Sequence, residues 1–493
     1  MDITWMGILI LLFLFIYSTW DNFYRNRNLP PGPTPLPLIG SILHIKKGRL
    51  VKSFIKLWDQ YGSVYTLYFG SRLVIVLCGY ETVKEALVDR GEEFGGRGPL
   101  PVMDKFAQGY GIGHANGERW KIMRSFTMKT LKSFGLAKKS HEWKIQKEAQ
   151  CIVDEFRKFD GHPFDPSKQL LEAVSNVLCA VIFGNRFDYT DGRFSKLIDI
   201  VEETFQLASS SWGKLHIILP SSIDYLPGPH HRIIQLSEEL AEFVHERVKA
   251  SQKSLDLSSP RHFIDSFLIK MEEEKKDPNT EFILRNLLVI AHNLFLAGTG
   301  TTSTTLRYGL LVLLKYHEVQ AKIHEEIDQV IGRDRVPCFD DREQMPYTQA
   351  VIHEIQRFCD VSPLNASHMV TKDVSFRGFH IPKGTEILPL LCTVHRDPKQ
   401  FASPWKFNPN HFLDENGKFQ RNDAVMAFSA GKRICVGENL ARMELFIFLT
   451  TILQSFSLVS QVQLTEDDIA PKMSGFLNGP IDFELSFLPR SNG

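Results

Sequence analysis

The first 28 residues constrain the fold most, because they divide the chain into an apolar segment and a much longer remainder. Residues 3–20, ITWMGILILLFLFIYSTW, are almost wholly apolar and have about the minimum length that crosses a bilayer. Asp2 precedes this run, and Arg25 and Arg27 follow it, unlike the basic start and small-residue end of a cleaved signal peptide. Positive charge after the span places the following chain on the cytoplasmic side. We predict an uncleaved transmembrane anchor over 1–28, with a cleaved signal peptide as the alternative.

A proline-rich segment follows this anchor. Residues 29–40, LPPGPTPLPLIG, contain five prolines. Prolines at this density exclude helix and favour stiff, extended structure. We predict a hinge over 29–40 that joins the anchor to a catalytic domain over 41–493. A ligand for an SH3-type domain is the alternative, since P-x-x-P spacing occurs here.

Composition excludes several classes of protein. Lysine plus arginine and aspartate plus glutamate both number 57, so no overall charge favours nucleic acid. The seven cysteines are scattered and form no C-x-x-C pair, which predicts neither a disulfide framework nor a zinc cluster. This cysteine usage suits a reducing compartment.

The pattern along the chain predicts a mainly α fold with small β-sheets, an α+β class. Strand-like runs over 63–79 come first, helical periodicity then dominates, and strand-like pieces return at 373–391 and 479–490. The glycine-rich stretch 109–117, GYGIGHANG, lacks the preceding strand and the spacing of a dinucleotide-binding turn. A redox enzyme with this sequence would receive its electrons from another protein.

The stretch FSAGKRICVG, 428–437, carries the strongest chemical signal. A cysteine thiolate is a good axial ligand for haem iron. Gly431 and Gly437 allow tight turns that aim backbone amides at the Cys435 sulfur, and a helix beginning near Gly437 adds its positive end. Arg433 can reach an anionic group on the edge of a cofactor. A buried structural cysteine in a glycine turn is the alternative.

This stretch resembles the F-x-x-G-x-R-x-C-x-G signature of the cytochromes P-450, the haem-thiolate monooxygenases. The match is complete at Phe428, Gly431, Arg433, Cys435 and Gly437.

Other motifs of this family occur in the expected order, and several sequence segments resemble those of family 2 of the vertebrate microsomal enzymes. HEIQRF supplies an E-x-x-R pair, Glu354 and Arg357, one helical turn apart. GERWKIMR supplies Trp120 and Arg124, and FNPNHF has His411 where the family often has arginine.

The resemblance implies a cytochrome P-450 fold, an N-terminal transmembrane helix, and haem b whose iron is bound by Cys435. It implies that the haem propionates are held by Arg97, Trp120, Arg124, His368 and Arg433, with Phe428 and Gly437 also in the haem-binding turn. It implies a structural network of Glu354, Arg357 and His411.

The resemblance makes 286–316 the long helix above the haem. Ala297 and Gly298 are expected to leave room for a ligand, and Thr301, with Thr302, supplies the hydroxyl at the oxygen-binding face. One departure concerns Gly300, because the family usually has a carboxylate directly before this threonine. Its absence implies either impaired proton delivery or chemistry that starts from a peroxide.

Partners and substrates follow from the resemblance and from local charge. Residues 119–139 include seven basic residues and no acidic one, so we expect an NADPH-dependent flavoprotein reductase, or cytochrome b5, to dock there and no nucleic acid. The apolar segment 211–228 is expected to meet the endoplasmic reticulum membrane, which favours lipophilic substrates. The candidate substrate pocket comprises Phe106, Phe205, Leu294, Ala297, Val361, Leu364, Phe476 and Leu477.

The sequence thus predicts a membrane-bound monooxygenase that inserts one oxygen atom from O2 into fatty acids, steroids or xenobiotics. Two alternatives stay open: a haem-thiolate isomerase or dehydratase that acts on hydroperoxides or endoperoxides without a reductase, and a non-catalytic haem or lipid binder.

Overall fold

The structure, a computed structural model, describes residues 3–25, 28–36, 39–46, 50–135, 142–218, 220–473 and 477–490. Its α-helices are α1 Ile3–Arg25, α2 Leu50–Tyr61, α3 Tyr80–Lys84, α4 Pro101–Ala107, α5 Gly117–Gly135, α6 Glu142–Arg157, α7 Ser167–Ile182, α8 Gly192–Ser209, α9 Ser211–Ile218, α10 Pro220–Ile223, α11 Pro229–Lys253, α12 Phe263–Glu273, α13 Leu284–Lys315, α14 His317–Val330, α15 Pro346–Cys359, α16 Leu391–His395, α17 Glu438–Ser455 and α18 Glu466–Ile469. Short helical turns are η1 Ile42–His44, η2 Glu85–Asp89, η3 Phe339–Gln344, η4 Pro409–Phe412 and η5 Gly431–Arg433.

The strands form one larger sheet and three small ones. They are β1 Val64–Phe69, β2 Arg72–Leu77, β3 Gly96–Arg97, β4 His368–Met369, β5 Val374–Phe376, β6 Phe379–Ile381, β7 Glu386–Pro389, β8 Phe456–Val459, β9 Lys472–Met473, β10 Asn478–Gly479 and β11 Ser486–Pro489. The larger sheet has the order β1-β2-β7-β4-β3, with β2 and β7 parallel and the other pairs antiparallel. Pairs β5–β6, β9–β10 and β8–β11 form the small sheets. The predicted α+β class and the early and late strands are confirmed.

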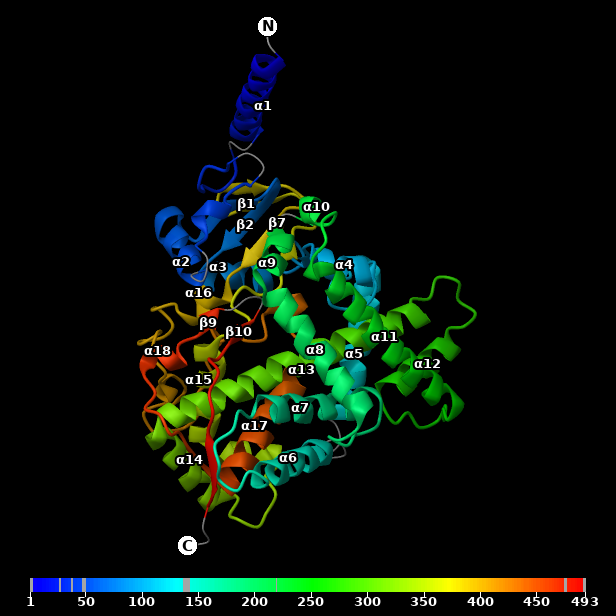
Figure 1. The fold of residues 1–493 in the computed structure, drawn as a ribbon, viewed down its shortest axis with the longest axis vertical. Helices are drawn as coiled ribbons and strands as arrows, with labels where there is room; N and C mark the ends of the chain where they lie inside the picture. The colour runs from blue at the N-terminus through cyan, green and yellow to red at the C-terminus, as the bar shows by residue number, and fades with distance from the viewer. Residues whose placement is uncertain are drawn as a thin grey trace.

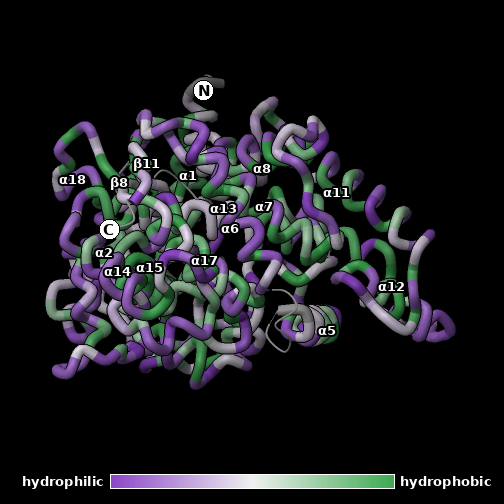
Figure 2. The backbone as a smooth tube through the Cα atoms, turned by 90° about the horizontal axis from the view of Figure 1, so that it is seen from below, coloured by the Kyte–Doolittle hydropathy of each residue, from purple (hydrophilic) through white to green (hydrophobic). Residues whose placement is uncertain are grey.

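Helix α13 crosses the middle of the molecule and organises its core (Figure 1). It packs against α7, α15 and α17, and the largest hydrophobic cluster combines residues of these helices with α6 and α14. Apolar segments lie mainly inside the molecule, whereas many outer loops are hydrophilic (Figure 2). Full burial of a side chain such as Phe295 or Leu311 stabilises the fold by about 1.5–3 kcal/mol. The predicted helix 286–316 is confirmed as α13.

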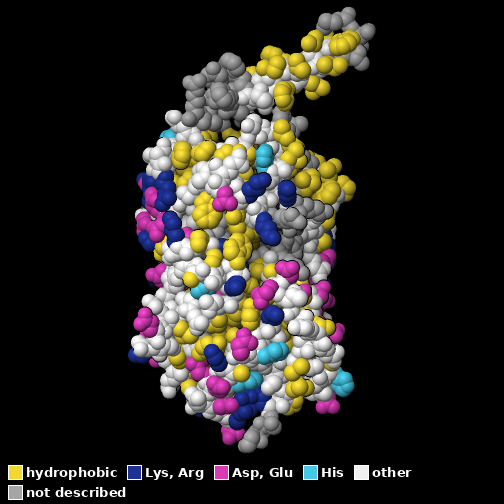
Figure 3. Space-filling view, turned by 90° about the vertical axis from the view of Figure 1, so that its left-hand side faces the viewer, with side chains coloured by type: hydrophobic (Ala, Val, Ile, Leu, Met, Phe, Trp, Pro, Cys, Tyr) yellow, Lys and Arg dark blue, Asp and Glu magenta, His cyan; other side chains and the backbone are white. Residues whose placement is uncertain are grey.

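Helix α1 projects from the body at the N-terminal end, and its surface is apolar (Figures 1 and 3). Side chains such as Leu11 and Phe13 are exposed by 69 % and 67 %. None of the helices among the described residues combines the length and the hydropathy that crossing a membrane requires. Next along the chain, Thr66 of β1 donates hydrogen bonds to the carbonyls of Pro30 and Pro31. The boundaries predicted for the anchor, the hinge and the catalytic domain stay predictions.

Candidate active site

One face of α13 is open although most of the helix is buried. Ala297 is exposed and Thr301, one turn later, is partly exposed, whereas Thr299, Gly300 and Thr302 are buried. Residues four apart lie on the same face of a helix. The Thr301 hydroxyl donates a hydrogen bond to the Ala297 carbonyl at 2.9 Å. The helix thus presents the Thr301 hydroxyl beside the exposed Ala297 in the middle of the molecule (Figure 1).

Gly298 serves helix packing, and the expectation that it leaves room for a ligand is wrong. A Cβ atom at this position would lie 2.9 Å from Cδ1 of Leu178 on α7. Glycine therefore lets α13 and α7 approach closely.

Gly300 faces Phe205, a predicted pocket residue on α8. A Cβ atom at position 300 would lie 2.3 Å from Cε2 of the Phe205 ring, far inside van der Waals contact. The ring occupies the space that a larger side chain would need. This packing gives a physical reason for the absence of a carboxylate before Thr301.

A carboxylic acid lies behind the next residue instead. Thr302 lies close enough to Glu444 of α17 to affect the pKa of this acid, and both side chains are almost fully buried. Burial raises the pKa of Glu444 from 4.5 to about 8, and the Thr302 hydroxyl offsets this only in part. Glu444 is therefore mostly protonated at neutral pH. The sequence analysis missed it, although an acid inside the apolar run RMELFIFL was a visible signal.

We expect Glu444→Gln to stabilise the protein at alkaline pH. The folded chain keeps a proton that the unfolded chain releases above about pH 4.5, so wild-type stability is full below that pH and falls as the pH rises to about 8. When the pKa of a group differs by one between the folded and the unfolded chain, the free energy of unfolding changes by up to about 1.4 kcal/mol. Urea unfolding at pH 5 and pH 8 should show a gap between the variant and the wild type that grows with pH. The exposed Glu242→Gln is the control, and an equal pH dependence in Glu444→Gln would contradict the assignment.

The turn around Cys435 holds its sulfur against the start of α17. Gly431 has φ +69°, and a Cβ atom there would lie 1.7 Å from the Leu87 carbonyl oxygen, so only glycine fits. The Cys435 amide donates to the Phe428 carbonyl at 2.9 Å. The backbone amides of Gly437 and Glu438 lie near the sulfur and lower the pKa of its thiol.

Cys435 is the one exposed cysteine, since the other six are buried or half-buried and all seven are free thiols. Burial nevertheless raises the pKa of its thiol above the usual value, with a partial offset from the two amides. The exposure of Cys435 and the effect of burial on its pKa are compatible, because a side chain that borders a space inside the protein is accessible and is still surrounded by the chain.

Three arginine side chains gather near this turn without any acidic partner. Arg433 stacks on Trp120, with Cζ 3.6 Å from the ring centroid, and Arg124 donates to the Ile434 carbonyl. Burial lowers the pKa of Arg433 to about 9 and of Arg97 to about 10, and repulsion between the guanidinium groups adds to both shifts. Among the described residues, no ion pair with Asp or Glu joins any of the three. The site therefore holds uncompensated positive charge.

Unpaired polar atoms mark the same place. Four of the buried nitrogens that lack a hydrogen-bond partner in the described chain belong to this part of the structure: Nη1 of Arg433, Nε1 of Trp120, Nε2 of His368 and Nδ1 of His114. The other ring nitrogen of His368 lies 2.8 Å from the Phe94 carbonyl oxygen. An unsatisfied buried polar group costs about 1–3 kcal/mol. Together with the positive charge, these atoms favour an anionic ligand that accepts hydrogen bonds.

Two polar residues of this cluster were not predicted. The Asn116 side-chain oxygen accepts from the Arg97 amide at 2.7 Å and from Nη2 of Arg433 at 2.8 Å. Burial and the charges of Arg97 and Arg433 lower the pKa of His114 to about 3. His114 and Asn116 both lie in the stretch just before Trp120. Their closeness in sequence to Trp120 was the only sign that they belong to this cluster.

The E-x-x-R pair forms a fully buried network. Arg357 Nε and Nη2 donate to the two Glu354 carboxylate oxygens at 2.6 and 2.7 Å. Its guanidinium also donates to the carbonyls of His395, Pro404 and Lys406. Nδ1 of His411 lies 3.3 Å from both Glu354 oxygens, so this histidine takes the third position of the network.

Comparison with known proteins identifies the family. Residues 30–487 match the family model described as Cytochrome P450. The chain belongs to the cytochrome P450 family. It is 53 % identical over 477 residues to cytochrome P450 2G1 of Rattus norvegicus, covering 97 % of each chain. It is 51 % identical over 457 residues to cytochrome P450 2F2 of Mus musculus (93 % of each) and 49 % identical over 477 residues to cytochrome P450 2C23 of Rattus norvegicus (97 % of each).

This cytochrome P450 is therefore a haem-thiolate monooxygenase with iron in its cofactor. The residues around the Cys435 turn fit a bound haem. Haem carries two propionate carboxylates, and the unpaired buried nitrogens and three guanidinium groups supply donors and opposite charge for them. The exposed Cys435 sulfur is of the soft, anionic donor type that iron accepts.

The predicted pocket residues are brought together only in part. Phe205 lies against Gly300 of α13, and Ala297 is exposed on the same helix. Phe106 packs on His292 of α13 with ring centroids 4.5 Å apart, and Leu294 lies in a hydrophobic cluster with α8; both are at least nine-tenths buried. Val361 accepts a hydrogen bond from Asn478, the neighbour of Leu477, and Leu364 packs beside β2 and β7. Phe476 lies outside the described residues.

Proposed function

We propose that this cytochrome P450 inserts one oxygen atom from O2 into lipophilic substrates, at a haem whose iron is bound by Cys435. The observation that carries the proposal is the Cys435 turn, where two backbone amides lie near the thiol of the exposed Cys435, beside three guanidinium groups that form no ion pair among the described residues. When bound, the haem supplies an iron that activates dioxygen, with electron density donated by the thiolate. Fatty acids, steroids and xenobiotics are the proposed substrate classes.

The residues of the chain would divide the remaining work. Arg97, Trp120, Arg124, His368 and Arg433 would hold the propionates, and Phe428, Gly431 and Gly437 would keep the turn in shape. Thr301 presents its hydroxyl on the open face of α13, where it can hold a proton or a water molecule. Thr302 turns away from that face toward Glu444.

We infer that electrons come from an NADPH-dependent flavoprotein reductase, with cytochrome b5 as a second donor to the same face. Three of the basic residues in 119–139 already have partners within the chain. Arg119 forms an ion pair with Glu281 at 2.7 Å and Lys121 with Glu118 at 2.5 Å. Arg124 donates to the Ile434 carbonyl. Lys129 and Lys132 remain exposed on α5, and Lys138 and Lys139 lie outside the described residues. Exposed basic residues on this helix suit an acidic partner.

We also propose that α1 attaches the enzyme to the endoplasmic reticulum membrane as a single-pass anchor, with the catalytic domain in the cytoplasm. Exposed apolar side chains along α1 support this, and Tyr225 and Leu226 in the turn after α10, exposed by 89 % and 45 %, offer a second apolar contact. Entry of substrate from the membrane would favour lipophilic compounds.

One experiment tests these proposals together. The full-length protein is reconstituted into vesicles with the reductase, and attachment is measured by flotation and product by turnover of lipophilic substrates. We expect the chain to float with the vesicles and product to require reductase, NADPH and O2. Full turnover of a hydroperoxide without reductase would instead favour the isomerase or dehydratase class, which Gly300 leaves open.

Within that assay, Thr301→Ala is expected to lower the product formed per NADPH severalfold and to raise released hydrogen peroxide. The variant removes the hydroxyl on the open face but keeps the helix, since Thr301 bonds only to the carbonyl of its own preceding turn. Thr305→Ala is the matched control, because its hydroxyl makes the same bond one turn later, to the Thr301 carbonyl at 2.8 Å. Unchanged coupling in Thr301→Ala would contradict this role.

A further inference from the structure

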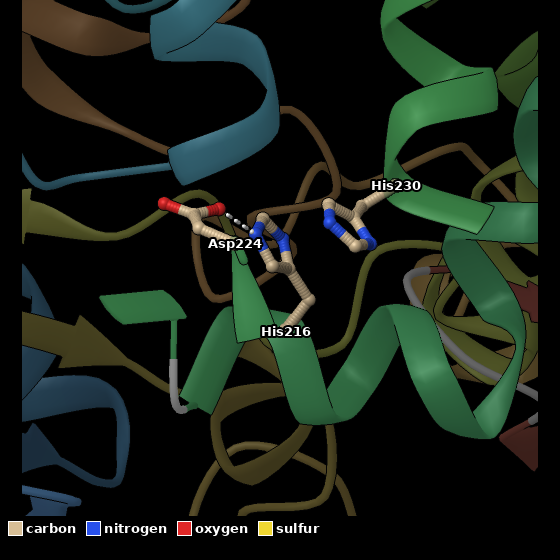
Figure 4. A group of neighbouring side chains, drawn as sticks. All are labelled: His216, Asp224 and His230. Carbon is tan, nitrogen blue, oxygen red and sulfur yellow. Dashed lines mark hydrogen bonds and ion pairs between the residues drawn. The ribbon is translucent and has the colours of Figure 1, made fainter. Parts of the chain in front are cut away.

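Three metal-ligating side chains meet away from the proposed haem site. His216 comes from α9, Asp224 from the turn after α10, and His230 from the first turns of α11 (Figure 4). One ligand atom of each lies within 4.8 Å of the others. Both histidines are fully buried, and Asp224 is partly buried.

The hydrogen bonds of this cluster leave two ring nitrogens unused. His216 Nε2 lies 2.6 Å from Asp224 Oδ1, and Trp212 Nε1 donates to His230 Nδ1 at 3.1 Å. In the described part of the chain, His216 Nδ1 and His230 Nε2 are buried without a partner. The two rings are nearly parallel, with centroids 4.6 Å apart, so they do not bond to each other edge to edge.

We propose that His216, Asp224 and His230 form a binding site for Zn²⁺. Two imidazoles and a carboxylate are a ligand set that zinc uses, with a water molecule as the fourth ligand. Zinc bonds of about 2.0–2.2 Å would draw the three ligand atoms closer together than they now lie.

Two existing contacts compete with the metal. Lys105 Nζ on α4 lies 2.7 Å from Asp224 Oδ1, so its ammonium group must leave that oxygen. Trp212 donates to Nδ1 of His230, which places the proton of the neutral ring on Nε2. Zinc at Nε2 moves that proton to Nδ1 and deprives Trp212 of its acceptor. In His216, zinc at Nε2 likewise moves the ring proton to Nδ1.

The bound ion would add a further link between three segments that side-chain packing and a few hydrogen bonds already hold together. It would tie α9 and the turn after α10 to the start of α11, beside Lys105 of α4. This site is independent of the proposed haem ligands, so its test does not depend on them.

The test measures Zn²⁺ affinity of the untagged, full-length, haem-loaded protein by competition with a chromogenic chelator. We expect one zinc ion per chain, bound at least ten-fold more weakly by Asp224→Asn and His230→Gln. The neighbouring His231→Gln is the control and should bind zinc like the wild type, because this exposed ring packs beside His230 and bonds to the Leu226 carbonyl but does not belong to the three-ligand cluster. The haem spectrum verifies that each variant is folded.

Two further variants separate a metal site from a merely structural cluster. Lys105→Met and Trp212→Phe remove the competing contacts, so both should bind zinc more tightly than the wild type. Equal affinity of the wild type, Asp224→Asn and His230→Gln would overturn the proposal. Absence of zinc binding in the wild type and in Lys105→Met would do the same.

Discussion

Cys435→Ala is expected to abolish the red-shifted absorption band that the reduced, carbon monoxide-bound protein owes to thiolate ligation, and all monooxygenase turnover with it. Alanine provides no donor to iron, while Gly431 and Gly437 still form the same turn. The backbone change is small, because alanine and cysteine share the Cβ atom. Loss of the band therefore reports loss of the ligand and not loss of the fold.

The control for this variant is Cys151→Ala on α6, a half-buried cysteine in another part of the chain. It should keep the band and the turnover. Carbon monoxide difference spectra of both variants, together with haem content, give the measurement. Persistence of the thiolate band in Cys435→Ala would remove the basis of the proposed function.

Arg357→Ala is expected to have the largest effect on stability. Its guanidinium is fully buried and donates to both Glu354 oxygens and to three backbone carbonyls. Removing it leaves the Glu354 charge buried without its main partner, which costs about 3–5 kcal/mol. We expect a clearly lower urea midpoint and a poor yield of haem-loaded protein.

Arg193→Ala is the comparison for Arg357→Ala. Arg193 forms a loose pair with Asp191 at 3.8 Å and is 74 % exposed, so its loss should cost less than about 1 kcal/mol. A double variant, Glu354→Gln with Arg357→Met, should lose less than the sum of the two single changes, since neither charge is then left alone. Equal unfolding free energies of Arg357→Ala and Arg193→Ala would show that the network is not structural.

Features that depend on nearby residues were predictable. The Cys435 turn could be predicted because glycine at 431 tolerates the positive φ of the turn, and because Gly437 directly precedes α17. Glu354 and Arg357 stand three apart on one helix, so their pairing follows from helical geometry. The strands β1 and β2 and the long helix α13 follow from residue type and periodicity.

The misinterpreted or missed features all depend on distant contacts. Gly298 was taken for ligand space, but Leu178 of another helix lies against it. The sequence could not show why residue 300 is glycine, because the Phe205 ring that fills the place of a side chain comes from another helix. Glu444 meets Thr302 only because α17 packs on α13.

The sequence by itself determined the resemblance to the family and the order of the main elements, which follow from motifs and periodicity. It also determined the cysteine turn and the pairing of Glu354 with Arg357, because each depends on spacing within one turn or one helix. Only the tertiary structure decided which polar groups share a buried environment. Asn116 bonds to Arg433 across 317 residues, and His216, Asp224 and His230 meet through the packing of three separate segments. Residue spacing carries no information about such contacts, because they arise when helices pack and exclude water from the side chains between them.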